Sequence, residues 1–173
     1  RETTIEVMGS GALFVEFLKQ GALHFAFGFD HVLFLLTLIF GVALGWREKK
    51  SSVGALRSLA WLVTAFTVGH SITLVFAALE FVSLPVRPVE VAIAASIVVV
   101  ALWNMTSFGR RHERPWAAFV FGLIHGFGFS SVLADVGLPT GRRAVALTGF
   151  NLGIEAAQLA FVALCFVPLL WLS

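Results

Sequence analysis

Histidine and carboxylate side chains occur inside long apolar stretches of this sequence, where ionisable groups are rare. His24, Asp30 and His31 fall in the segment HFAFGFDH, and His70 and His125 each lie within a later apolar run. An ionisable group in the hydrocarbon layer of a membrane costs about 2.5 to 3.5 kcal/mol on insertion scales, so each one needs a partner or a use. These side chains are therefore the first candidates for chemistry.

Two further carboxylates extend this set. Glu90 opens another apolar segment, and Glu155 lies well inside the last one. Neutral imidazole and carboxylate are ligands favoured by Zn, Ni, Co and Fe, and helical bundles build metal sites from ligands on different helices. The residue types therefore favour a site for a divalent transition-metal ion. Its candidate ligands are His24, Asp30, His31, His70, Glu90, His125 and Glu155.

Other polar residues in the apolar segments follow helical spacing. Positions three or four residues apart share one face of a helix. Two such stripes are Asn151, Glu155 and Gln158, and Thr64, Thr67 and Ser71. Glu90 and Asn104 would lie about 40° apart around a third helix. We expect these polar faces to satisfy one another by meeting in the interior of a bundle.

Glycine residues near the histidines predict local departures from simple helix packing. His24 and His31 would share a face of an unbroken helix whereas Asp30 would point elsewhere, and a distortion at Gly28 would bring the three together. Small residues repeat at four-residue intervals beside His125, a spacing that lets two helix backbones approach closely. These small residues are Gly122, Gly126 and Ser130.

Each candidate also has an ordinary structural explanation. A buried imidazole can be satisfied by a Thr or Asn side chain or by a backbone carbonyl. Glu90 lies near Arg87 and is as well explained by an interfacial ion pair as by a role as ligand. The stripe that contains Glu155 would also serve simply to join two helices. Several such residues in one chain nevertheless favour the metal site.

The composition indicates that these residues are carried by membrane helices. Of 173 residues, 58% are hydrophobic and 13% charged, whereas soluble domains carry about 25% charge. The apolar runs are continuous, without the alternation that β-barrel strands show. Each crossing needs about 20 apolar residues, so the length suffices for five or six crossings. The predicted fold class is all-α, a polytopic transmembrane helical bundle.

Breaks in the apolar runs divide the chain into about five spanning helices. We expect them at about 21–45, 59–79, 89–108, 116–136 and 144–172, preceded by an interfacial or partly inserted helix at 9–20. Residues 1–8 are predicted to form an extracytoplasmic linker or strand, and 9–173 a single transmembrane domain. Because the chain starts at Arg1 without an initiator Met, we expect a processed or trimmed product, and its first residues do not have the pattern of a signal peptide.

Charge and cysteine content limit the partners. The net charge of +2 comes from basic residues in short clusters between apolar runs, which are typical topology signals and do not indicate nucleic acid. Seven Lys and Arg follow the first and third crossings and five lie on the other side, which places the amino terminus outside. The single cysteine, Cys165, excludes both a disulfide framework and a thiolate metal site.

Five segments of the chain together resemble the HupE/UreJ family of bacterial membrane proteins. In order they are HFAFGFDHVLFLLTLI, TAFTVGHSITL, PVEVAIAASIVVVALWN, FGLIHGFGFSSVL and FNLGIEAAQ, and they extend from His24 to Gln158. The resemblance implies a multi-pass protein of the bacterial inner membrane that acts as a nickel or cobalt permease linked to hydrogenase or urease maturation. The implied site residues are His24, Asp30, His31, His70, Glu90, His125 and Glu155.

The motifs DHxLFLL, TAFTxxHSxTL and HGxGF resemble one branch of this family more than its hydrogenase-linked members. The HP dipeptide typical of those members is replaced by His24 and Phe25. This departure weakens the expectation of nickel, so Ni, Co and Zn all remain candidate ions.

Transport of the ion is the preferred functional hypothesis, with the lipid bilayer and the metal ion as partners. An intramembrane zinc-dependent hydrolase, with Glu155 or Asp30 as its base, is the alternative. An accessory membrane subunit with a structural metal is a third. The sequence leaves open whether the chain assembles as a homo-oligomer or within a membrane complex.

Overall fold

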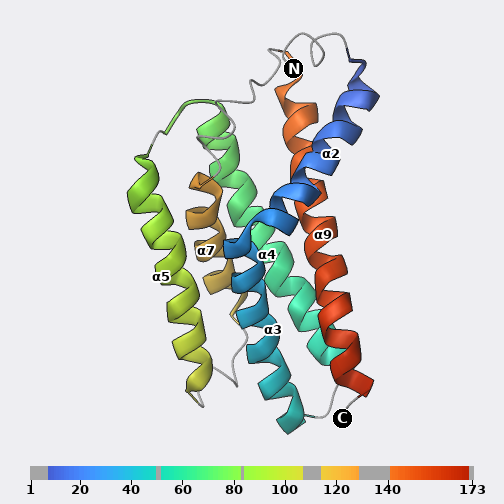
Figure 1. Cartoon of the computed structure of the whole chain (residues 1–173), viewed down its shortest axis with the longest axis vertical. Coiled ribbons are helices and arrows are strands. Elements are labelled where there is room, and N and C mark those ends of the chain that lie inside the picture. Colours follow the sequence, from blue (N-terminus) through green and yellow to red (C-terminus); the bar gives the residue numbers. More distant parts are fainter. Residues whose placement is uncertain (1–7, 50–51, 83, 107–113, 129–140, 172–173) are drawn as a thin grey trace.

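The computed structural model describes residues 8–49, 52–82, 84–106, 114–128 and 141–171. All secondary-structure elements within these ranges are helices (Figure 1), so the predicted all-α class is confirmed. The helices are α2 (Ser10–Phe27), α3 (Phe29–Lys49), α4 (Ser52–Ala78), α5 (Val86–Met105), α7 (Pro115–Phe127) and α9 (Arg143–Trp171). The predicted linker or strand at 1–8 lies outside the described residues apart from Met8.

Three of the described helices are long and apolar enough to cross a membrane on their own. These spans are Val53–Ala78, Val86–Met105 and Arg143–Phe166. The pair α2 and α3 is apolar enough to cross together but is bent by 70° between Ser10–Phe27 and Phe29–Leu44, as in a broken span or a re-entrant loop. Helix α7 is apolar but has only 13 residues, and the remainder of the predicted crossing at 116–136 lies largely outside the described residues. The structure is therefore a membrane helical bundle.

The predicted boundary between an interfacial helix and the first crossing, near Gly21, is wrong. Gly21 lies inside α2, which runs without interruption from Ser10 to Phe27 and packs along α9. The buried face of α2 comprises Leu13, Phe17, Gly21 and Phe25. This regular four-residue spacing gives one continuous apolar face, while Glu16 accepts a hydrogen bond from Gln20 on an exposed side. The polar residues therefore do not end the helix.

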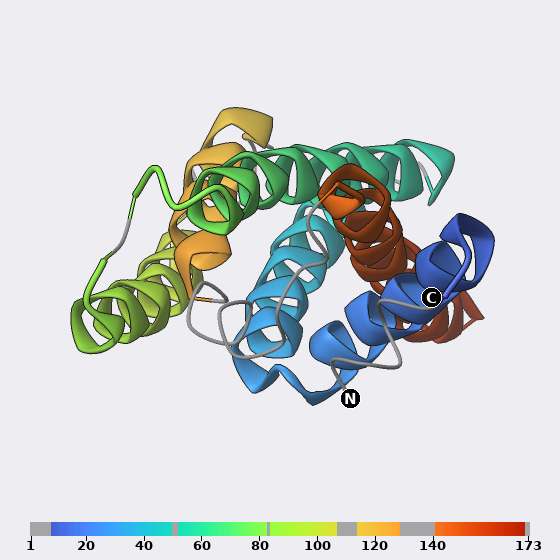
Figure 2. The same cartoon turned by 90° about the horizontal axis from the view of Figure 1, so that it is seen from above.

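Helix α4 joins the two halves of the bundle. Seen from above, α5 and α7 lie on one side, α2 and α9 on the other, α3 lies between them, and α4 runs along one edge of the bundle past both α7 and α9 (Figure 2). Helix α4 contacts α7, α9 and α3. A residue near the middle of α4 can therefore meet side chains from both halves.

Helices α4 and α7 approach each other through glycines. A Cβ atom on Gly122 would collide with the carbonyl oxygen of Phe66, and one on Gly126 would collide with the side chain of Thr73 and the carbonyl of His70. Contacts of this kind let two helix backbones lie side by side in a membrane. The prediction is confirmed for these two glycines, whereas Ser130 lies outside the described residues.

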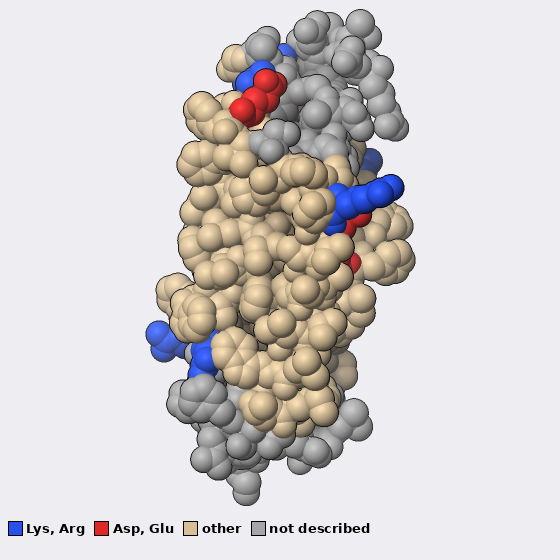
Figure 3. All heavy atoms as spheres, turned by 90° about the vertical axis from the view of Figure 1, so that its left-hand side faces the viewer, with Lys and Arg blue, Asp and Glu red and all other residues tan. Residues whose placement is uncertain are grey.

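The outer faces of the helices are apolar. Exposed side chains include Phe40, Val91, Val98, Leu102 and Leu164. Much of the middle of the face shown in Figure 3 carries no charged side chain, and Lys, Arg, Asp and Glu lie mostly nearer its ends. A broad apolar belt of this kind is stable against lipid and costly in water, which supports association with a bilayer.

Candidate metal centre

Histidines from four helices meet inside the bundle. His24 lies in the last turn of α2, His31 in the first turn of α3, His70 within α4 and His125 in the last turn of α7. The ring centroid of His31 lies 4.9 Å from that of His24 and 5.4 Å from those of His70 and His125. His31, His70 and His125 are 3%, 0% and 1% exposed. The structure thus brings all four predicted histidines together.

The break at Gly28 positions the first part of this cluster. Its backbone N–H donates to the carbonyl of His24, and its own carbonyl accepts from the N–H of Val32, so the chain turns without losing these bonds. A Cβ atom on Gly28 would lie 2.7 Å from the carbonyl oxygen of His24 and 3.0 Å from Nδ1 of His31. Only glycine fits so close an approach. The distortion expected at Gly28 is therefore present as the 70° bend.

Two overlapping groups of three residues could hold an ion. The first comprises His24, His31 and His70, and the second Asp30, His31 and His125. Within each group the ligand atoms lie within 4.8 Å of one another. Two nitrogens bound to one tetrahedral zinc at about 2.1 Å lie about 3.4 Å apart. Either group would therefore close around an ion by side-chain rotation, and His31 is common to both.

Hydrogen bonds engage one nitrogen on each of two histidines. Nδ1 of His31 lies 3.1 Å from Oδ1 of Asp30, and Nε2 of His125 lies 2.9 Å from Oγ of Ser96. Nε2 of His31, both ring nitrogens of His70 and Nδ1 of His125 are buried, with no hydrogen-bond partner among the described residues. Buried polar atoms rarely lack partners. A cluster of such nitrogens fits the donor set of a transition-metal ion.

Aromatic rings close one side of the cluster. Phe34 and Phe66 each lie 5.1 Å from His125 between ring centroids, and Phe150 lies 5.4 Å from His24. Apolar walls exclude water and strengthen electrostatic interactions with a bound cation. Asp30 is the exception to this enclosure, because its side chain is 37% exposed. The carboxylate therefore connects the buried cluster with its surroundings.

Glu90 and Glu155 belong to neither group of three. Glu90 is exposed on α5, whose buried face comprises Val89, Ile93, Ser96 and Val100. One residue along a helix is a rotation of about 100°, so Glu90, directly after Val89, turns away from that face. Asn104, expected to share its face, instead donates to the carbonyl of Thr37 on α3 at 2.7 Å. The structure therefore does not bring Glu90 to the histidines.

Glu155 belongs to a series of hydrogen bonds between α4 and α9, which we call the α4–α9 ladder. Its three bonds join Thr64 to Glu155 at 2.9 Å, Thr67 to Gln158 at 2.8 Å and Ser71 to Asn151 at 2.7 Å. Each bond joins a hydroxyl on α4 to an oxygen on α9, and the hydroxyls of Thr67 and Ser71 also lie 3.1 and 2.7 Å from carbonyl oxygens of their own helix. The two polar stripes expected from the sequence thus face each other directly, beside His70.

Ser96 was not among the candidates from the sequence. It is buried on α5, and its hydroxyl contacts a candidate ligand, His125. A lone serine in the run AIAASIVVVAL is the only signal that the sequence gives for it, and such a residue commonly bonds only to its own helix.

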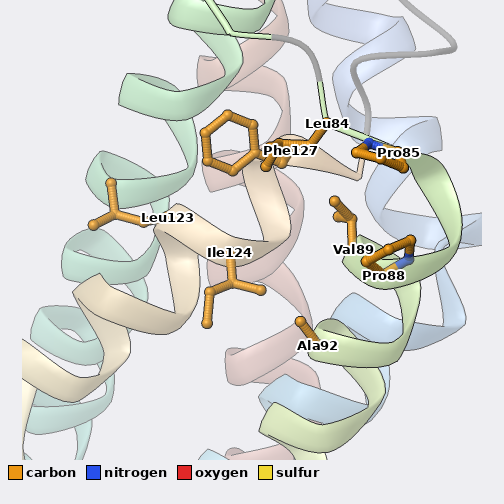
Figure 4. Close-up of a pocket in the computed structure, with 8 residues that line it drawn as sticks. All are labelled: Leu84, Pro85, Pro88, Val89, Ala92, Leu123, Ile124 and Phe127. Carbon is orange, nitrogen blue, oxygen red and sulfur yellow. The ribbon is translucent and has the colours of Figure 1, made fainter.

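An apolar groove of about 330 Å³ lies between α5 and α7 (Figure 4). It is lined by Leu84, Pro85, Pro88, Val89, Ala92, Leu123, Ile124 and Phe127. None of these lining residues is a candidate ligand. The groove is therefore separate from the histidines.

Comparison with known proteins gives one match. A family model described as HupE / UreJ protein matches residues 1–173, which is the whole chain. No curated protein and no solved structure matches it.

Proposed function

The chain belongs to the HupE/UreJ family, and we propose that it binds a divalent transition-metal ion at the histidine cluster and carries it across the membrane. The observation that carries this proposal is the convergence of four histidines from four helices on one buried place. Burying unpartnered imidazole nitrogens is costly. A cation that passes through the cluster would be coordinated by these nitrogens, which otherwise lack partners among the described residues.

The donor set favours particular ions. It is rich in imidazole, contains one carboxylate, Asp30, and includes no thiolate. Imidazole suits Ni, Co and Zn, whereas Mg and Ca prefer sites made only of oxygen. We therefore propose Ni²⁺, Co²⁺ or Zn²⁺ as the cargo.

The polar residues around the cluster support permeation. Asp30 is partly exposed and lies next to His31, so it is placed to receive an ion and pass it to the buried imidazoles. The α4–α9 ladder continues from His70 along α4 to Thr64 and Glu155, about one and a half helical turns further on. A conducting pathway must bind its ion weakly enough to release it. A cluster of neutral imidazoles with one nearby carboxylate suits that requirement.

The orientation proposed for the chain places the amino terminus outside in a bacterial inner membrane. Helices α3 and α5 end, and α4 begins, at the same end of the bundle (Figure 1). The basic clusters assigned to the cytoplasmic side lie in the sequence at and after the ends of α3 and α5, with Arg57 near the start of α4. An excess of Lys and Arg on the cytoplasmic side is what the positive-inside rule requires, so this distribution along the sequence supports the proposed orientation.

Metal uptake into proteoliposomes that contain a metal-sensitive dye tests the proposal. We expect Ni²⁺, Co²⁺ or Zn²⁺ to enter with the wild-type chain, and entry to be lost in His31→Ala and His70→Ala. Glu90→Gln is the matched control, because this exposed carboxylate lies in neither group and its variant should transport normally. Uptake that persists in both histidine variants would refute the proposal.

A zinc-dependent hydrolase is the second candidate function. Three protein ligands with one free coordination position are typical of catalytic zinc, and each group has three residues. However, Glu155 is hydrogen-bonded to Thr64 outside both groups, which leaves Asp30 as the base. Zinc-dependent cleavage of a membrane peptide by the purified chain, lost in Asp30→Asn, without metal uptake would favour this function over transport.

A further inference from the structure

Ser96 is buried where α5 meets His125 of α7. It lies on α5 with 3% of its surface exposed. Its Oγ atom is 2.6 Å from the carbonyl oxygen of Ile93 on the same helix and 2.9 Å from Nε2 of His125 on α7. The hydroxyl therefore makes one bond within its own helix and one to the histidine.

The chemistry of these two bonds favours one direction for each. A serine hydroxyl has a single hydrogen to donate, and a backbone carbonyl can only accept. The hydrogen of Ser96 therefore goes to Ile93, and its oxygen accepts from an N–H at Nε2 of His125. A neutral imidazole with its hydrogen on Nε2 carries its lone pair on Nδ1. Nδ1 of His125 is buried, with no hydrogen-bond partner among the described residues.

The opposite tautomer is less favourable. With its hydrogen on Nδ1, His125 would bury a donor that has no acceptor in the described part of the chain. The hydroxyl of Ser96 would then turn towards Nε2 and leave its bond with Ile93. An unmade buried hydrogen bond costs more than an ordinary one contributes.

We infer that Ser96 is a positioning residue that holds His125 in the Nε2–H tautomer and leaves the lone pair on its buried Nδ1 as the donor for an ion that His125 binds with Asp30 and His31. This inference rests on the proposed function, because it identifies Nδ1 as the atom that His125 offers to the ion. Asp30 has the same relationship to His31, since it accepts from Nδ1 and leaves Nε2 for the ion. Metal-binding histidines generally donate their other ring N–H to such a partner, which fixes the tautomer and orients the ring.

The tautomer can be measured without any metal. Nitrogen NMR of the chain in micelles, with ¹⁵N-labelled histidine and the His125 signals assigned from a His125→Asn variant, reports which ring nitrogen carries the hydrogen. We expect Nε2–H in the wild type and in Ser96→Thr, which keeps the hydroxyl. Ser96→Ala should give a mixture of tautomers.

The affinity for Zn²⁺, measured by titration calorimetry on the same samples, tests the link to metal binding. Loss of a partner of a metal-binding histidine typically weakens affinity by about 10- to 100-fold, and we expect this for Ser96→Ala with recovery in Ser96→Thr. The matched control is Thr37→Ala, because Thr37 also donates to a carbonyl in its own helix, at 2.6 Å, but is in neither group of ligands. Its affinity should be that of the wild type.

The possible results distinguish a failure of the role inferred for Ser96 from a failure of the proposed metal binding. Wild-type Zn²⁺ affinity in Ser96→Ala, or an Nδ1–H tautomer in the wild type, would overturn the role of Ser96 and leave the metal site standing. A wild-type chain that binds neither Zn²⁺, Ni²⁺ nor Co²⁺ would overturn the proposed function, and the positioning role with it. If Ser96→Thr fails to fold, the tautomer of the wild type and the affinity of Ser96→Ala still decide the question.

Discussion

Nδ1 of His31 lies 3.1 Å from Oδ1 of Asp30, the residue that precedes it in the chain. Neighbouring residues in a regular helix point about 100° apart, and the two side chains meet here at the start of α3, next to the break at Gly28. The carboxylate accepts from Nδ1–H, which leaves the lone pair of His31 on Nε2. This contact therefore links the exposed edge of the cluster to its shared ligand.

Removing the carboxylate of Asp30 should weaken metal binding. Because Asp30 orients His31, we expect Asp30→Ala to lower the affinity for Zn²⁺ by about 10- to 100-fold. Asp30→Asn keeps an acceptor oxygen for Nδ1–H and should lose less. Titration calorimetry on the two purified variants measures the difference. Equal losses would mean that the negative charge or direct ligation by Asp30 matters more than orientation.

Replacing His70 should weaken metal binding without lowering the stability of the metal-free protein. Both of its ring nitrogens are buried, without hydrogen-bond partners among the described residues, and such groups cost about 1 to 3 kcal/mol each. In metal-free samples, His70→Leu should therefore melt at the same temperature as the wild type or higher. A ligand at 100 times its Kd stabilises a protein by about 2.7 kcal/mol, so added Zn²⁺ should raise the melting temperature of the wild type more than that of His70→Leu, which keeps only the group of Asp30, His31 and His125.

A different result would point to a structural role for His70. If His70→Leu melted well below the metal-free wild type, the imidazole would contribute to the packing of the bundle. A wild-type melting temperature that does not change with added Zn²⁺ would contradict metal binding at the cluster, and one that a chelator leaves unchanged would count against a metal held only for structure.

The sequence indicated which polar side chains lie inside the bundle better than it indicated the helix boundaries. The convergence of the four histidines and the meeting of the two polar stripes agree with the expectation that polar groups in apolar segments turn towards one another, because burial of a polar group in a membrane leaves few alternatives. The continuous helix from Ser10 to Phe27 could not be predicted in this way. Its boundary depends on packing against α9, which the local sequence does not reveal.

The third predicted crossing shows the same limit. Glu90 was a candidate because of its charge, yet it lies one position away from the buried face of α5, whereas Ser96 lies on that face. Which face of an apolar helix is buried depends on its neighbours when all its sides are apolar. The sequence alone therefore favoured the more conspicuous residue over the one that touches His125.

The α4–α9 ladder should contribute measurable but modest coupling. Hydrogen bonds between membrane helices average about 0.6 kcal/mol in double-mutant cycles, with a maximum of about 1.7 kcal/mol. We expect a coupling in this range between Thr67→Val and Gln158→Leu, whose side chains are joined at 2.8 Å. Unfolding in mixed micelles measures the two single variants and the double variant. Strict additivity would show that this bond does not stabilise the pair of helices.

The glycine contact between α4 and α7 should control both stability and metal binding. A Cβ atom on Gly122 would collide with the backbone carbonyl of Phe66, and a backbone cannot rotate away as a side chain can. We therefore expect Gly122→Ala to destabilise the bundle by about 1 to 3 kcal/mol and, by moving His125 away from His31, to weaken Zn²⁺ binding. The control is Gly11→Ala in α2, where a Cβ atom would meet nothing within 4 Å. There the higher helix propensity of Ala should raise the free energy of unfolding by about 0.5 to 1 kcal/mol. Thermal melting and calorimetry of both variants measure these effects, and if Gly122→Ala matched Gly11→Ala in both, the close approach of α4 and α7 would not be what holds His125 in place.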